Sequence, residues 1–82
     1  MSTLHEIQLL VRQGCHLCQA ARETVHDVTQ RLGMQFTELD IDEYPALLER
    51  HHEEVPVLLI DGQVRDFWTI DGARLERLLQ TS

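Results

Sequence analysis

The sequence contains no lysine, so its positive charge comes from seven arginines, against fourteen aspartates and glutamates and a net charge of −7. Nucleic acids and anionic membrane surfaces bind proteins through clustered positive charge, and we expect neither as a partner. No apolar run approaches the roughly 20 residues of a membrane span, and the N-terminus lacks the basic segment and apolar core of a secretory signal. We therefore expect a cytoplasmic protein.

The chain also lacks internal repeats, linkers and low-complexity segments. Its 82 residues, 43% hydrophobic and 26% charged, are typical of one ordinary globular domain. We expect residues 1–82 to form a single domain that acts as a monomer.

Cysteine is scarce, and the two that exist, Cys15 and Cys18, stand at the start of the longest helical pattern. Positions i and i+3 of a helix lie on one face with Cα atoms roughly 5 to 6 Å apart, which suits a disulfide. Unpaired amides and the positive end of the helix dipole stabilise an anion there. We expect Cys15 to be the more acidic, nucleophilic thiol and Cys18 to be the resolving thiol.

The same C-x-x-C spacing is half of a zinc site, which would need two further ligands. The chain has no second C-x-x-C, and its histidines do not show a zinc-finger spacing. A purely structural disulfide is unusual in a cytosolic chain. Redox chemistry is therefore the favoured interpretation, and we assign no metal ligands.

Hydrophobic periodicity predicts the element order βαβαββα. Apolar residues at three- and four-residue steps predict that one helix buries Leu17, Ala21, Val25, Val28 and Leu32. The predicted ranges are strands over 6–12, 34–41, 55–60 and 63–69, and helices over 16–32, 45 to about 53, and 71–79.

Three further expectations concern single residues. Asp42 follows a predicted strand and is expected to cap the next helix. His51 and His52 are adjacent, so their side chains point about 100° apart on a helix, and we interpret them as surface residues. Trp68 either lines the active-site groove or packs in the core or at the end of the hairpin, and packing is favoured because aromatic residues are few.

The order of elements, with Cys15-His16-Leu17-Cys18 at the first helix and Val55-Pro56 at the third strand, resembles the glutaredoxin branch of the thioredoxin superfamily. The likeness covers nearly the whole chain. Together with Trp68 and the Arg74-Leu75 helix, these motifs are similar to small bacterial glutaredoxin-like proteins. The resemblance implies an α/β minimal thioredoxin fold, with a four-stranded mixed sheet and helices on both faces.

The resemblance also implies roles for individual residues. Cys15 matches the family's nucleophile and Cys18 its resolving cysteine. Pro56 matches its cis-proline, and Val55 matches the residue whose backbone pairs with an extended substrate. Arg12 stands where glutaredoxins usually carry a lysine that meets the glutathione carboxylate, although a solvated charge at a strand end is an equal alternative.

The sequence departs from the family at the positions that bind glutathione. His16-Leu17 replaces the usual Pro-Tyr between the cysteines; a protonated His16 would favour the neighbouring thiolate, or His16 simply faces solvent. Asp66-Phe67 stands near the family's Gly-Gly pair, and Glu54 replaces the threonine of Thr-Val-Pro. Side chains there would fill the space that glycines leave open. These departures argue against glutathione binding.

We therefore predict a thiol–disulfide oxidoreductase that acts on disulfide-containing proteins or small thiols. Its electron donor would be a flavoenzyme reductase or glutathione, and no cofactor is expected beyond glutathione as a co-substrate. Two alternatives remain open, which are a carrier of a metal or iron–sulfur cluster held by the same cysteines, and an interaction module that does no chemistry.

Overall fold

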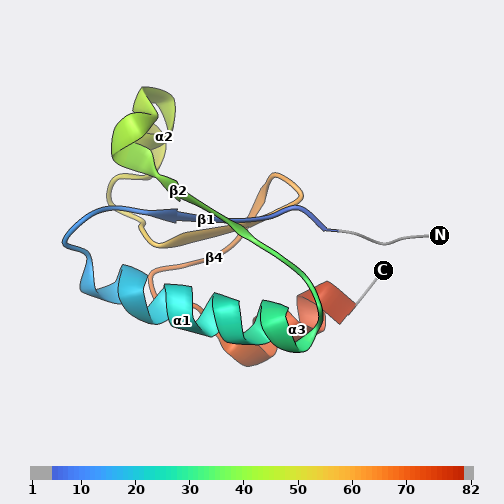
Figure 1. Cartoon of the computed structure of the whole chain (residues 1–82). Coiled ribbons are helices and arrows are strands. Elements are labelled where there is room, and N and C mark those ends of the chain that lie inside the picture. The colour runs from blue at the N-terminus through green and yellow to red at the C-terminus, as the bar shows by residue number, and fades with distance from the viewer. Residues whose placement is uncertain (1–4, 81–82) are drawn as a thin grey trace.

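The computed structural model describes residues 5–80 and has the predicted order of elements (Figure 1). Residues 1–4, in the segment expected to lack a secretory signal, lie outside this range. The elements are β1 (Ile7–Val11), α1 (His16–Arg31), β2 (Thr37–Asp40), a 3₁₀ turn η1 (Ile41–Glu43), α2 (Pro45–His51), β3 (Val57–Ile60), β4 (Gln63–Phe67) and α3 (Gly72–Gln80).

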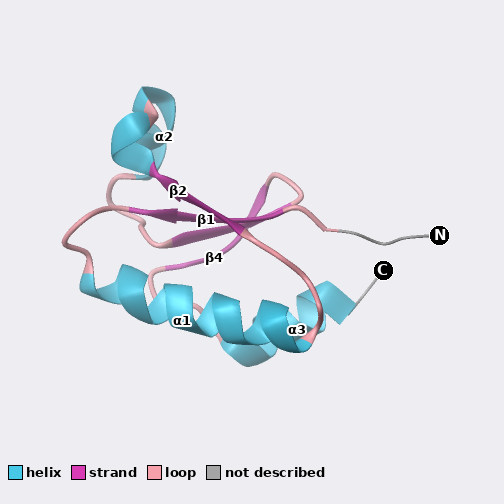
Figure 2. Ribbon diagram, viewed as in Figure 1, coloured by secondary structure: helices cyan, strands magenta, loops and turns pink. Residues whose placement is uncertain are grey.

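The four strands form one mixed sheet in the order β2-β1-β3-β4. β1 pairs parallel to β2 and antiparallel to β3, and β3 pairs antiparallel to β4. Helices α1 and α3 cover one face of the sheet and α2 lies on the other (Figure 2). This is the predicted α/β fold, with a four-stranded mixed sheet between helices.

Alternation along β1 supplies apolar side chains to both faces of the sheet. Leu9 belongs to the larger core cluster under α1 and α3, whereas Leu10 belongs to a smaller cluster that includes Leu47 and Leu48 of α2. Both β1 residues are fully buried. No helix among residues 5–80 has the length and apolar character needed to cross a bilayer.

Two turns follow the sequence signals closely. Asp61 and Gly62 connect β3 to β4 with φ values of 54° and 83°, as a two-residue hairpin turn requires. Gly14 has φ 76° between β1 and α1, a conformation that favours glycine. Gly14 therefore supplies the sharp bend that brings Cys15 to the start of α1.

The predicted buried face of α1 is wrong at its first residue. Leu17 is 46% exposed, and Cys18 is buried instead, with 1% exposure. The helix is thus rotated so that a thiol, and not the leucine, meets the core cluster beneath α1.

The expectations for Asp42 and His51 are also wrong. Asp40 caps η1 by accepting a hydrogen bond from the Asp42 amide, and Tyr44 precedes α2 without a side-chain cap. The carboxylate of Asp42 instead pairs with Arg12. His51 is buried at 6% exposure and its Nδ1 lies 3.0 Å from Glu54 Oε1.

Candidate functional site

The strand register brings three segments to one end of the sheet. Leu10 at the end of β1 pairs with Val57 at the start of β3, and Val57 pairs with Phe67 at the end of β4. The residues just beyond these positions are therefore neighbours at this sheet end. They are the turn at 12–15, the segment 55–56 and the residue that follows β4.

Cys15 is the N-cap of α1. Its backbone is extended, with φ −95° and ψ 113°, and its Sγ accepts a hydrogen bond from the Cys18 amide at 3.1 Å. A serine or aspartate oxygen does the same at an ordinary N-cap. Because α1 is 16 residues long, the sulfur lies at the positive end of a full helix dipole. The first turn of the helix therefore directs an amide donor at Cys15 Sγ, and the partly exposed thiol remains reachable.

Cys18 lies one turn further along and is almost fully buried. Burial raises the pKa of its thiol to about 12, and the hydrogen bond with Cys15 adds to this effect, while the Arg12 backbone and the charge of Arg22 lower it. Both cysteines are free thiols in this structure. The two thiols are thus chemically distinct. Cys15 caps the helix and is partly exposed, whereas Cys18 is buried and its thiol is protonated.

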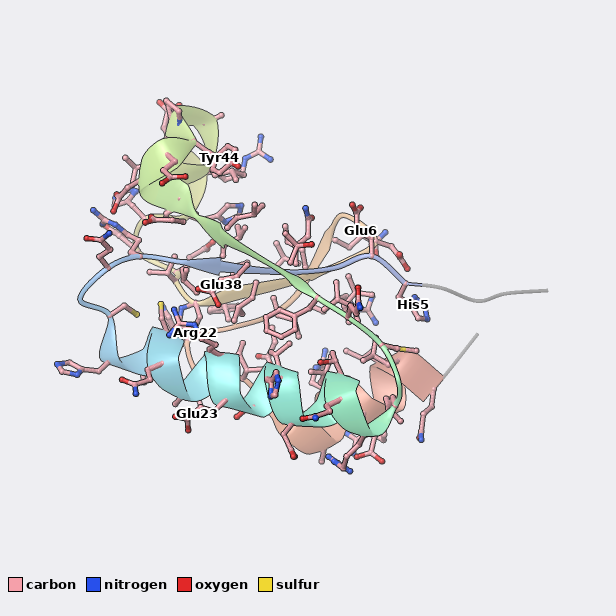
Figure 3. The ribbon with its side chains drawn as sticks, in the orientation of Figure 1. His5, Glu6, Arg22, Glu23, Glu38 and Tyr44 are labelled. Atoms are coloured by element: carbon pink, nitrogen blue, oxygen red, sulfur yellow. The ribbon has the colours of Figure 1, made fainter. Side chains whose placement is uncertain are left out.

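Arg22 lies one turn after Cys18 and forms a two-point ion pair with Glu38 of β2 (Figure 3). The hydrogen bonds to Glu38, and more weakly the charges of both cysteines, raise the pKa of Arg22. Sequence reasoning missed this pair. The i, i+4 spacing from Cys18 to Arg22 was the signal that could have found the arginine.

Three of the residues predicted for the site line one shallow groove of about 330 Å³, together with Arg22. They are Arg12, Cys15 and His16. The guanidinium of Arg12 donates from Nε to Asp42 Oδ1 at 3.1 Å, so a carboxylate already partners it. Cys18 does not line this groove and is buried in the core cluster under α1.

Val55 and Pro56 lie at the same sheet end without lining that groove. The peptide bond between them is cis. The Pro56 carbonyl accepts a hydrogen bond from the Trp68 amide at 2.9 Å, and the Trp68 indole donates to the Glu53 carbonyl at 3.0 Å. Trp68 is 53% exposed and its ring meets that of Phe67 edge to face, so it packs at the end of the hairpin and not in the core.

Asp66 and Phe67 stand near the positions where the family resemblance places a Gly-Gly pair, and their side chains occupy that space. The Asp66 carboxylate accepts hydrogen bonds from the amides of Phe67 and Asp71, both at 3.0 Å. These amides are therefore already paired. Among residues 5–80, no group of three or more histidine, cysteine, aspartate or glutamate side chains is arranged to hold a metal ion.

Residues 6–80 match the family described as Glutaredoxin-like domain (DUF836). Uncharacterized proteins of Mycobacterium tuberculosis and Mycobacterium bovis are each 29% identical over 75 residues, covering 85% of this chain and 77% of the relative. The structural genomics target XcR50 from X. campestris is 31% identical with a TM-score of 0.73, over 89% of this chain and 93% of that one.

More distant structures have the same fold. Protein Ne2328 from Nitrosomonas europaea superposes with a TM-score of 0.81 at 18% identity, over 98% of this chain and 96% of that one. A thioredoxin mutant from Halobacterium salinarum gives 0.71 at 21% identity, over 93% of this chain and 72% of that one. The fold is therefore that of thioredoxin, as the sequence motifs predict.

Proposed function

The chain belongs to the glutaredoxin-like domain family, and we propose that it is a thiol–disulfide oxidoreductase in which Cys15 is the nucleophile and Cys18 the resolving thiol. The observation that carries this proposal is the hydrogen bond from the Cys18 amide to Cys15 Sγ at the start of α1. A thiolate is the attacking species in disulfide exchange, and a helix N-terminus favours it.

The reaction has two exchanges. The Cys15 thiolate attacks one sulfur of the substrate disulfide, so that a Cys15–substrate bond forms, the substrate bond breaks and the leaving thiolate takes up a proton. Cys18 then loses its proton and attacks Cys15 Sγ, which forms the Cys15–Cys18 disulfide and releases the second substrate thiolate. Two electrons pass from the protein to the substrate, and an external donor returns them.

The donor we favour is a flavoenzyme reductase of the thioredoxin-reductase type, and not glutathione. The Asp66 carboxylate holds the amides of Phe67 and Asp71, so neither amide is free to bind glutathione where the family resemblance places its binding segment. Arg12, which stands where the family resemblance places a glutathione contact, pairs with Asp42. We further propose that Val55 and Pro56 receive the substrate backbone, and that the protein works in the reducing cytoplasm as a monomer.

A reductase assay tests this proposal. The reduced protein is supplied with a protein disulfide and, separately, with a glutathione mixed disulfide, each with a flavoenzyme system or with glutathione as donor. We expect turnover with the flavoenzyme, none for Cys15→Ser, and a stable mixed disulfide for Cys18→Ser. Equal activity of Cys15→Ser and the unaltered protein would overturn the assignment of the nucleophile.

The cluster-carrier alternative has its own readout in the same preparation. Protein purified without oxygen would show visible absorbance and bound iron, or stoichiometric zinc, if the cysteines held a metal. Loss of that metal in Cys15→Ser, combined with no reductase activity in the unaltered protein, would favour the alternative.

A further inference from the structure

Two of the chain's four aromatic residues stand together on the surface at the sheet end that carries the cysteines. Phe67 is 42% and Trp68 53% exposed, and their rings meet edge to face with centroids 4.9 Å apart. Large aromatic side chains contribute most to stability when buried. A pair left in solvent at the sheet end that carries the cysteines is therefore typical of a recognition surface.

The Trp68 ring is fixed before any partner arrives. Its amide donates to the Pro56 carbonyl and its indole nitrogen to the Glu53 carbonyl. Its φ of 65° lies in a region that bulky residues rarely adopt. Because both ends of the residue are held, little side-chain entropy remains to be lost on binding.

The rings lie within reach of a substrate attached to Cys15. Phe67 and Leu10 are two strands apart, which places them about 10 Å from each other across the sheet. Cys15 and Val55 pack against the same core cluster. An extended peptide covers about 3.3 to 3.6 Å per residue, so about three residues span the two strand spacings between β1, which leads into Cys15, and the end of β4, which carries the rings.

The surroundings of the rings are acidic. The side chain of Glu53 is 85% exposed and that of Glu54 46% exposed. The side chains that contact these carboxylates are imidazoles, with His52 at 3.5 Å from Glu53 and His51 at 3.0 Å from Glu54. With a chain charge of −7, this rim attracts a basic segment and repels an acidic one.

We propose that Phe67 and Trp68 bind the protein segment that flanks a substrate disulfide, and that they select a bulky apolar residue two or three positions from the cysteine, with a basic residue beyond it. This inference rests on the proposed function, because the segment is delivered through the Cys15 mixed disulfide. It predicts that the substrates are protein disulfides flanked by apolar and basic residues.

Three peptide disulfides test the selection. They are identical except that the flanking pair is leucine and arginine, glycine and arginine, or leucine and glutamate, and a small aliphatic disulfide serves as reference. We expect the leucine–arginine peptide to have the highest kcat/KM. In Trp68→Ala its advantage over the reference should fall about tenfold, as for an aromatic hot spot.

Val64→Ala is the matched control, since Val64 is 47% exposed on the same strand. We expect Val64→Ala to keep the peptide preference. Equal loss in both variants, or equal kcat/KM for the leucine and glycine peptides, overturns the inference while leaving the reductase intact. If no disulfide is reduced by the unaltered protein, the proposed function fails and this inference fails with it.

Fluorescence gives a readout that is independent of turnover, because Trp68 is the only tryptophan. In Cys18→Ser, each peptide is linked to Cys15 as a mixed disulfide. We expect the leucine–arginine peptide to shift the emission to shorter wavelength, as the indole leaves water, and the glycine peptide to leave it unchanged. An unshifted emission with the leucine–arginine peptide overturns the inference.

Discussion

Arg22 and Glu38 join α1 to β2 through two parallel hydrogen bonds, with Nε to Oε1 at 2.7 Å and Nη2 to Oε2 at 2.8 Å. This is the two-point geometry that suits a guanidinium and a carboxylate. It holds a fixed positive charge beside Cys18, whose pKa that charge lowers against the larger effect of burial. The pair therefore bears on how readily the buried thiol can react.

We predict that Arg22→Gln slows the resolving step. Loss of the positive charge favours the protonated form of Cys18, so resolution should be roughly two- to threefold slower. Because the pKa of Cys18 is already raised to about 12, its thiolate fraction grows with pH throughout the neutral range. The rate should rise with pH in both proteins, with the Arg22→Gln curve displaced to higher pH. Quenched-flow trapping of the mixed disulfide measures this.

Arg31→Gln is the control for that experiment, since Arg31 is also on α1 but pairs with Asp27 and Glu76, away from the cysteines. It should leave the pH profile unchanged. Arg22→Lys keeps the charge and should restore part of the rate. A profile for Arg22→Gln that overlays that of the unaltered protein would show that Arg22 has only a structural role.

Alkylation should separate the two thiols. Cys15 is partly exposed and Cys18 is 1% exposed with a protonated thiol, so a limiting amount of iodoacetamide should label Cys15 alone in the folded protein. In denaturant both should react. Peptide mass spectrometry after brief labelling gives the answer, and significant early modification of Cys18 would contradict the burial on which the resolving role depends.

Much of this architecture follows from local signals. The apolar run of β1, the Asp61-Gly62 turn and the helical period of α1 each determine their element, because periodicity and turn chemistry act over a few residues. The failures are tertiary. Leu17 fits the apolar stripe of α1 as well as Cys18 does, and only packing against the sheet decides which of them is buried.

The site shows the same division. The cysteine pair and the Val55–Pro56 segment are visible as motifs, but the Arg22–Glu38 pair joins residues 16 positions apart on different elements. The exposure of Trp68 depends on hydrogen bonds to Pro56 and Glu53, which no pattern in the sequence specifies. Contacts between elements therefore had to come from the structure.

The hairpin turn should contribute to the acid sensitivity of the fold. Hydrogen bonds from His5 and from the Glu6 amide lower the pKa of Asp61 in the folded state. A lowered pKa stabilises the fold at pH values above the pKa of the unfolded state, and this contribution is lost as pH falls through the pKa of the folded state. Asp61→Asn should therefore lower Tm at pH 7 while reducing the further loss of Tm on acidification. Thermal unfolding followed by circular dichroism at several pH values measures both, and identical acid profiles would contradict the assignment.

Gly14→Ala tests whether the turn before α1 positions the nucleophile. At φ 76° an alanine is strained, although its Cβ would meet no atom within 4 Å, so the cost is that of the backbone, about 1–2 kcal/mol. Gly62→Ala is the matched control, because Gly62 has φ 83°, is equally open and lies in the hairpin turn. Urea unfolding should show similar losses for both variants. Only Gly14→Ala should also slow alkylation of Cys15, because relief of its strain moves the residue that caps α1. Equal alkylation rates in the two variants would mean that Cys15 is held by the helix alone.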